Sequence, residues 1–195
     1  MTEQPTLVFR AARALTMPGA ARAFRLSVSG AEFLPGGGFV LCANHRSGLD
    51  AWALTAPLAP RQPRYMAKAE LFRPPLRGLL DAAGVFPAAR GTCCVSTIRT
   101  AIAHARAGRA VIVFPQGSRQ PYPPRPGAAY VALAAGVPLV PAAIAGTERL
   151  GRPWRVAFGE PIDLAELAAL PRCAASQEAT VRLWRRIEQL RAELA

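Results

Sequence analysis

The chain has 195 residues, of which 51% are hydrophobic, so its composition excludes a disordered polymer and suffices for one domain with a sizeable core. Its 24 basic residues against 12 acidic ones give a formal net charge of +12, and Lys68 is the only lysine. This arginine excess favours an anionic partner, such as phospholipid headgroups, although arginine-rich codon usage explains it equally well.

The N-terminal residues 1–24 are predicted to form a basic amphipathic segment, in which a helical run ends at Pro18-Gly19. Two interpretations of its apolar face stay open. Packing against the protein's own core is the commoner use of such a face, and binding to an anionic membrane surface is the alternative. No apolar run reaches the roughly 18 to 20 residues that cross a bilayer. The apolar face is formed by Leu7, Val8, Ala11, Ala12 and Leu15.

Short apolar runs alternate with helical patterns along the rest of the chain. This alternation predicts an α/β fold with a mostly parallel central sheet flanked by helices, and residues 1–195 are expected to form a single domain. The predicted strands are residues 25–29, 39–43, 64–68, 84–87, 110–114, 137–144 and 154–158. The predicted helices are residues 48–58, 74–83, 95–107, 128–135 and 176–194.

The four cysteines have no Cys-x-x-Cys spacing and no paired histidines beside them. We therefore predict no metal site and expect reduced thiols in a cytoplasmic protein. The cysteines are Cys42, Cys93, Cys94 and Cys173.

An imidazole and a carboxylate follow the apolar run 39–43, at His45 and Asp50. Five helical residues turn through about 500°, so the two side chains share no helix face. They can meet if His45 precedes a helix and Asp50 lies in its first turn, with Ser47 as the N-cap of a capping box. Asp50 is then expected to hold one ring nitrogen and leave the other free as a base. An ordinary loop histidine beside a capping aspartate is the alternative.

A second polar segment, residues 114–119, follows the apolar run 110–114. Its proline and glycine predict a tight turn with exposed backbone amides. Ser118 then offers a hydroxyl and Arg119 a planar fork, and together these could hold a phosphate. A surface turn that happens to contain an arginine is the alternative.

Together the two segments resemble the glycerolipid acyltransferase family typified by 1-acylglycerol-3-phosphate acyltransferases. The family's Asn-His-x-Ser-x-x-Asp block is matched by Asn44, His45, Ser47 and Asp50. Its Phe-Pro-Glu-Gly-Thr-Arg block is matched at five positions, with serine for threonine, by Phe114, Pro115, Gly117, Ser118 and Arg119. Between them, Lys68, Gly84 and Arg90 resemble the family's lysine, glycine and arginine. The blocks occur in order, and the resemblance covers about residues 27–161.

The resemblance implies transfer of a fatty acyl group from a thioester to the free hydroxyl of a lysophospholipid, most simply 1-acylglycerol-3-phosphate. It implies catalysis by His45 and Asp50, and binding of substrate by residues of both blocks and of the segment between them. These are Asn44, Ser47, Lys68, Arg90, Gln116, Gly117, Ser118 and Arg119. No cofactor is implied, because acyl-CoA or an acyl carrier protein thioester is a co-substrate. The expected location is peripheral, on the inner face of the cell membrane.

One departure affects the acceptor: Gln116 replaces the family's glutamate. This replacement leaves open the alternative that the protein is an acyltransferase with another acceptor, such as a lyso-aminolipid or a glycolipid. A non-catalytic lipid-binding relative is a second alternative. A nucleic-acid-binding protein, suggested by the charge alone, lacks a recognition motif, so no nucleic acid is expected as a partner.

Overall fold

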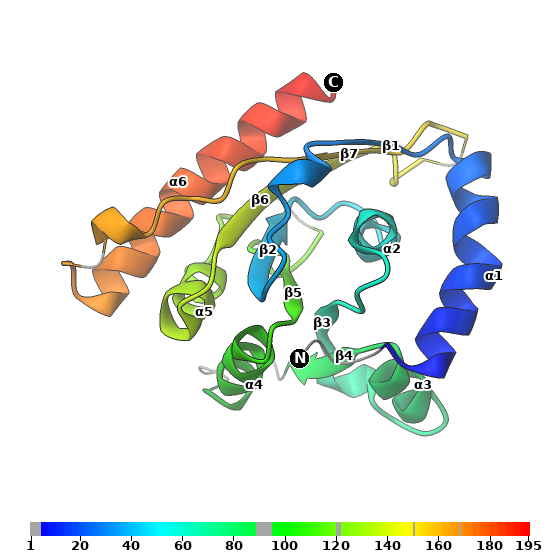
Figure 1. The fold of residues 1–195 in the computed structure, drawn as a ribbon, viewed down its shortest axis with the longest axis horizontal. Helices are drawn as coiled ribbons and strands as arrows, with labels where there is room; N and C mark the ends of the chain where they lie inside the picture. The colour runs from blue at the N-terminus through cyan, green and yellow to red at the C-terminus, as the bar shows by residue number, and fades with distance from the viewer. Residues whose placement is uncertain (1–4, 89–94, 120–121, 150, 168) are drawn as a thin grey trace.

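The computed structural model describes residues 5–88, 95–119, 122–149, 151–167 and 169–195. Seven strands form one sheet in the order β1-β7-β6-β2-β5-β3-β4, and every neighbouring pair is parallel except β6 with β7 (Figure 1). The predicted α/β fold with a mostly parallel sheet is confirmed. The strands are β1 Ser27–Ser29, β2 Phe39–Ala43, β3 Arg64–Lys68, β4 Val85–Ala88, β5 Ala110–Val113, β6 Leu139–Ala145 and β7 Arg155–Phe158.

The central strands are apolar without interruption because helices cover both faces of the sheet. All five residues of β2 are buried. Val40 is paired with Val111 of β5 on one side and with Leu139 of β6 on the other. Since these strands run parallel, β2, β3, β5 and β6 all end at one edge of the sheet.

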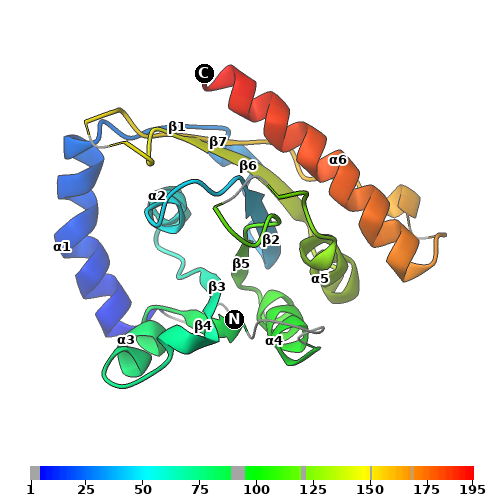
Figure 2. The same ribbon diagram turned by 180° about the vertical axis from the view of Figure 1, so that it is seen from behind.

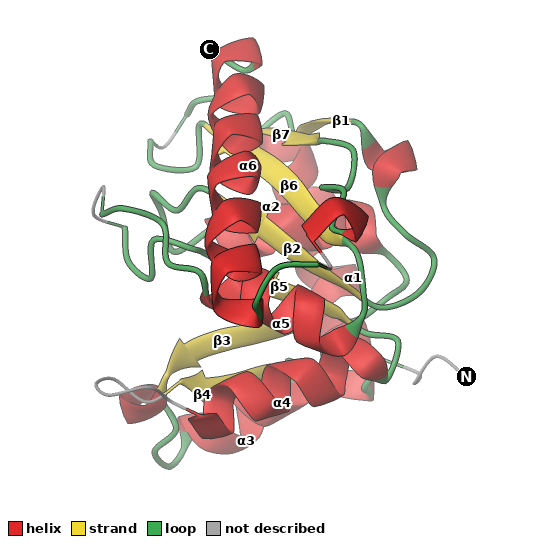
Figure 3. Cartoon of the chain, turned by 90° about the vertical axis from the view of Figure 1, so that its left-hand side faces the viewer, coloured by secondary structure: helices red, strands yellow, loops and turns green. Residues whose placement is uncertain are grey.

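Helices form a layer on each face of the sheet (Figures 1 and 2). α4, α5 and α6 cover one face, where side chains such as Val40 and Leu139 enter their core, and Figure 3 shows α6 running along β6. α2 covers the other face, where Leu54 packs with Leu41. The helices are α1 Leu7–Ala23, α2 Asp50–Thr55, α3 Leu76–Ala82, α4 Val95–Arg106, α5 Gly127–Ala135 and α6 Arg172–Glu193. Short 3₁₀ turns are Ala31–Phe33, Ala56–Leu58, Ala69–Leu71 and Ala165–Leu167.

Three details of the predicted helices were wrong. The first helix does not end at Pro18 but continues to Ala23. Proline removes one N–H bond from the turn, and the exposed helix lets water solvate the released carbonyl. The helix predicted from residue 48 begins at Asp50, and the last helix begins at Arg172 instead of residue 176.

The apolar face of α1 is not packed on the protein's own core. Leu7 is 78% exposed and Leu15 is 82% exposed, whereas Phe9, which is not part of the predicted apolar face, is buried. Thr6, just before the helix, anchors it by donating a hydrogen bond to the carbonyl of Ala82 at 2.6 Å. Core packing of the predicted face is therefore contradicted, and the membrane interpretation remains.

Candidate active site

The two polar segments meet at the edge where the parallel strands end. The first follows β2 and the second follows β5, and these two strands are direct neighbours. In open α/β sheets this edge is where ligands bind, because loops there expose polar groups above a buried core.

His45 and Asp50 are in contact. Nδ1 of His45 lies 2.8 Å from Oδ2 of Asp50. The Asp50 side chain is fully buried, whereas 19% of the His45 side chain is exposed. The imidazole also stacks on Phe114, with ring centroids 4.0 Å apart and an angle of 16° between the ring planes. One nitrogen of the ring is thus fixed by a carboxylate, and the ring plane is fixed by an aromatic neighbour.

Asp50 is held in its ionised form. Burial alone would raise its pKa, but hydrogen bonds from His45, Ser47, Thr147 and Arg46 outweigh burial and lower the pKa below its ordinary value. The backbone N–H groups of Arg46 and Ser47 donate to Oδ2 at 2.7 and 2.8 Å. Because the carboxylate only accepts hydrogen bonds, Nδ1 carries the proton in this contact, and Nε2 of the neutral ring is left as the acceptor.

Thr147 completes the carboxylate's surroundings. Its buried hydroxyl donates to Oδ1 of Asp50, so each carboxylate oxygen is satisfied. Thr147 follows the end of β6, at the same edge of the sheet as His45. Sequence reasoning missed this residue because it stands 97 positions from its partner.

Asn44 has a structural role that the sequence did not predict. Its side-chain amide donates to the carbonyl of Ile144 and accepts from the N–H of the same residue, both at 2.9 Å. This pair of hydrogen bonds joins the end of β2 to β6 in the same way as the backbone hydrogen bonds between paired strands. It fixes the backbone directly before His45, while substrate binding by Asn44 stays a prediction.

Half of the predicted capping box forms. The Asp50 carboxylate accepts from the N–H of Ser47, as expected, but Oγ of Ser47 accepts from Leu49 at 3.2 Å. The amide of Ser47 is therefore occupied by Asp50, and the amide of Gly117 donates to the carbonyl of Phe114 at 2.9 Å.

The second segment forms the predicted tight turn after β5. Gly117 adopts a φ of +68°, which a glycine tolerates and other residues rarely do. Arg119 is exposed and reaches across to the first segment, where its terminal nitrogen lies 3.6 Å from the position that a Cβ on Gly48 would occupy. Ser118 is half-buried. The guanidinium therefore lies beside the turn that contains the histidine and aspartate.

Gln116 lines the cavity that is described below. Its side chain is almost fully buried, and Nε2 donates to the carbonyl of Tyr122 at 3.0 Å. A glutamate carboxylate cannot donate this bond. The amide at position 116 thus ties the proline-rich loop to the end of β5, which gives the departure from the family pattern a structural reason.

Lys68 ends β3 and is exposed. The register of β3 with β5 places it at the same edge as the second segment. No hydrogen bond links it to His45, Asp50 or Arg119 in the part of the chain that the structure describes. Arg90 lies outside the described residues, so its predicted role is not addressed.

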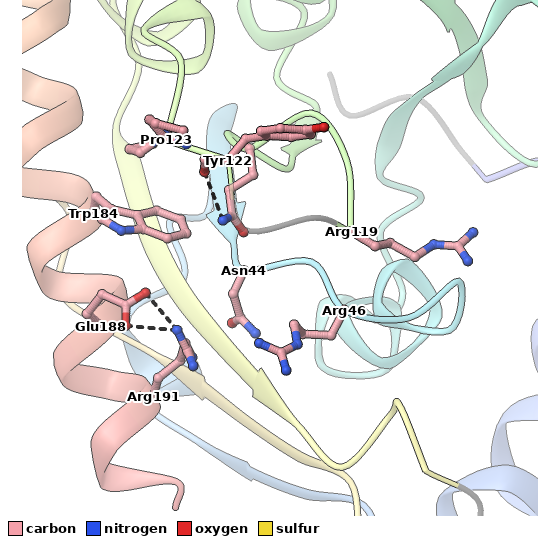
Figure 4. A pocket seen from close by; sticks show the side chains of 10 residues that line it. Asn44, Arg46, Arg119, Tyr122, Pro123, Trp184, Glu188 and Arg191 are labelled. Carbon is pink, nitrogen blue, oxygen red and sulfur yellow. Dashed lines mark hydrogen bonds and ion pairs between the residues drawn. The ribbon is translucent and has the colours of Figure 1, made fainter.

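A cavity of about 310 Å³ opens between the two segments and α6 (Figure 4). Asn44 and Arg46 lie on one side of it, and Trp184 and Arg191 of α6 lie opposite. Arg119 also lines it, and Figure 4 shows its guanidinium directed away from Trp184. Within the described ranges, no cluster of three or more His, Cys, Asp or Glu side chains is placed to hold a metal ion. In the same ranges, no helix combines the length and apolarity needed to cross a membrane.

A buried carboxylate behind a partly exposed histidine, at the ligand-binding edge of an α/β sheet, is an arrangement suited to general-base catalysis. A family model described as Acyltransferase matches residues 25–145. The 1-acyl-sn-glycerol-3-phosphate acyltransferase of Bacillus subtilis (strain 168) is 35% identical over 169 residues, which cover 80% of this chain and 83% of that protein. The chain belongs to the acyltransferase family.

The chain is also similar to a second bacterial protein and to a solved structure. The 1-acyl-sn-glycerol-3-phosphate acyltransferase of Streptococcus pneumoniae (strain ATCC BAA-255 / R6) is 32% identical over 136 residues, covering 66% of this chain and 52% of that protein. The crystal structure of the 1-acyl-sn-glycerophosphate acyltransferase PlsC from Thermotoga maritima matches with a TM-score of 0.64 at 22% identity. The match covers 94% of this chain and 83% of that one. It supports the fold.

Proposed function

We propose that the protein transfers a fatty acyl group from a thioester to the free hydroxyl of 1-acyl-sn-glycerol-3-phosphate. The contact between His45 and Asp50 is the observation that carries this proposal. Both bacterial relatives are named for this reaction, and the contact supplies the base that it needs.

Nε2 of His45 takes the proton of the acceptor hydroxyl while the hydroxyl oxygen bonds to the thioester carbon. The tetrahedral intermediate then collapses, the carbon–sulfur bond breaks, and the imidazolium returns the proton to the thiolate. Asp50 stabilises the imidazolium because it is ionised and only 2.8 Å away. A positioned base of this kind contributes about 10²- to 10⁴-fold.

The phosphate of the acceptor is the group that Arg119 would bind. Arg119 is exposed beside the turn of Gly48, and a planar guanidinium binds phosphate through two parallel hydrogen bonds. Lys68 extends this positive edge, and Arg90 keeps the role that the family resemblance gives it. The acyl donor is the thioester of coenzyme A or of an acyl carrier protein, and it is a co-substrate.

The test is an acceptor panel. Purified protein is incubated with palmitoyl-CoA and with lysophosphatidate, monoacylglycerol, a lyso-aminolipid or a lyso-glycolipid, and products are measured by mass spectrometry. The proposal predicts phosphatidate as the main product. Arg119→Ala should raise KM for lysophosphatidate about tenfold, whereas Arg125→Ala, an exposed arginine beyond the turn, should not. Preferred acylation of another lysolipid, or no thioester consumption at all, would contradict the proposal.

The same proposal includes an anionic membrane surface as a partner. α1 exposes Leu7, Val8 and Leu15 and carries the exposed arginines Arg10 and Arg22. Apolar side chains that insert at the headgroup level, with arginines beside anionic lipid, are the features of a helix that lies on a membrane. A lysolipid acceptor resides in that surface, so such binding brings enzyme and acceptor together.

Vesicle flotation tests whether α1 binds the protein to an anionic membrane surface. We predict stronger binding to vesicles with phosphatidylglycerol than to pure phosphatidylcholine, and a loss of binding in Leu15→Asp. Val181→Asp is the matched control, because Val181 is also exposed but lies on α6, on the opposite layer. Equal loss in both variants, or no dependence on anionic lipid, would contradict a role for α1.

A further inference from the structure

A second cavity, of about 500 Å³, lies on the other side of Asn44. It opens between the end of β2, the connection from β6 to β7, and the last turn of α6. Four arginines from these three places line it: Arg46, Arg152, Arg155 and Arg191. Glu148 is the one acidic side chain among its described lining residues. The cavity is therefore strongly positive.

The arginines of this cavity are poorly neutralised. Nε of Arg155 is buried and has no hydrogen-bond partner among the residues that the structure describes. In the same ranges, the guanidinium groups of Arg46 and Arg152 form no ion pair. Arg191 is held by both carboxylate oxygens of Glu188 at 2.8 Å. Guanidinium groups that lack a carboxylate partner within the described part of the chain, here those of Arg46, Arg152 and Arg155, favour a ligand with several anionic oxygens when they line a concave site.

This cavity shares Asn44, Arg46 and Arg191 with the first cavity and extends from them toward the connection from β6 to β7. Arg46 and Arg119 extend in opposite directions, Arg46 toward Asn44 and Arg191, and Arg119 away from them (Figure 4). Arg119 and Lys68 lie on the β5 and β3 side, whereas the second cavity lies on the β6 side. His45 stands between Asn44 and Arg46, both of which line the cavity. A ligand in this cavity therefore lies beside the segment that carries the histidine.

We propose that the second cavity binds the phosphate groups of coenzyme A, the carrier of the acyl donor. This inference rests on the proposed function, which requires an acyl thioester. Coenzyme A carries a diphosphate and a separate ribose phosphate, which match several guanidinium forks better than one lipid phosphate does. Its flexible pantetheine arm places the thioester at a distance from the phosphates, in reach of His45. A concave site of this size suits a small nucleotide ligand better than the convex surface of a carrier protein.

The test compares two arginines of one connection. Arg152 lines the cavity, whereas Arg149, three residues earlier, is exposed and does not. Calorimetric titration with coenzyme A alone should show about tenfold or more weaker binding in Arg152→Ala, and no change in Arg149→Ala. Arg155→Ala should weaken binding similarly. In the acylation assay, Arg152→Ala should raise KM for palmitoyl-CoA by a similar factor and leave KM for lysophosphatidate unchanged. Palmitoyl-pantetheine, which lacks the phosphates, should be used equally well by all variants.

Several results would overturn the inference. One is unchanged coenzyme A binding in both Arg152→Ala and Arg155→Ala. Another is a raised KM for lysophosphatidate instead of palmitoyl-CoA, which would assign the cavity to the acceptor. A third is a raised KM for an acyl carrier protein thioester alone, which would assign it to a protein donor. Because the titration needs no turnover, it decides the inference even if the acceptor panel contradicts the proposed function.

Discussion

Replacing Asp50 by asparagine separates charge from geometry at the candidate site. Oδ2 of Asp50 accepts from His45, Arg46 and Ser47, and Oδ1 accepts from Thr147. An asparagine whose oxygen occupies the Oδ2 position keeps the first three bonds. Its NH₂ group then faces Thr147, whose hydroxyl can rotate to accept. Asp50→Asn therefore keeps the orientation of the imidazole and removes only the negative charge behind it.

The expected effect of Asp50→Asn is a fall in kcat of about 10²- to 10⁴-fold, because the imidazolium formed during transfer is no longer stabilised. Steady-state assays with palmitoyl-CoA and lysophosphatidate measure it. Circular dichroism and thermal unfolding verify the fold. Asp81→Asn is the matched control, since Asp81 lies exposed on α3 and pairs with Arg77 at 3.8 Å. A folded Asp50→Asn variant with wild-type kcat would refute the reasoning.

The same substitution has a pH signature. The folded protein lowers the pKa of Asp50 below its ordinary value of 3.8. Its ionised form therefore stabilises the fold above about pH 3.8, and this contribution is lost as the pH falls through the lower folded-state pKa. The difference in free energy of unfolding between wild type and Asp50→Asn should shrink over that acidic window. Urea unfolding between pH 7 and pH 2 measures it, and a constant difference would contradict the assigned ionisation.

The remaining predictions concern the surroundings of the site. Gln116→Glu should lower the free energy of unfolding in urea by about 1 to 3 kcal/mol, because a buried carboxylate would face the carbonyl of Tyr122. A variant as stable as the wild type would contradict the hydrogen bond between Gln116 and Tyr122. Thr147→Val keeps the shape of the side chain but removes one hydrogen bond to Asp50, so kcat should fall by less than in Asp50→Asn. A larger fall in kcat than in Asp50→Asn would contradict this order of the two residues. Burial raises the pKa of the Cys42 thiol, so iodoacetamide should not label it in the native protein but should do so in urea, as peptide mass spectrometry will report. Labelling of native Cys42 would contradict its position in the sheet.

Much of the fold follows from local patterns. Residues 39–43 form an uninterrupted apolar run, which is typical of a strand buried on both faces, and β2 has the predicted ends. The contact of His45 with Asp50 was also predictable, because a helix start brings residues of this spacing together. The position of α1 was not predictable, since a helical wheel shows that the helix has an apolar face but does not show what covers that face. Pro18 misled the prediction of its end, because an exposed helix can accommodate the lost bond.

The long-range parts of the site had no local signal. Asn44 bonds to Ile144, 100 residues away, and Thr147 bonds to Asp50 across 97 residues. Both depend on β6 lying beside β2, and strand order is set by the packing of the whole sheet. The four arginines of the second cavity likewise come from three separate places in the chain. They are few among 24 basic residues, so composition alone did not distinguish them from the rest of the surface.

The activity of His45→Ala tests the central claim most directly. Wild type and variant are incubated with palmitoyl-CoA and lysophosphatidate, and phosphatidate is measured by mass spectrometry, with thermal unfolding to verify the fold. The account predicts that phosphatidate formation falls at least about 10²-fold, while the variant stays folded, because the imidazole is the base and its side chain is partly exposed. A folded His45→Ala variant that forms phosphatidate at the wild-type rate would contradict it.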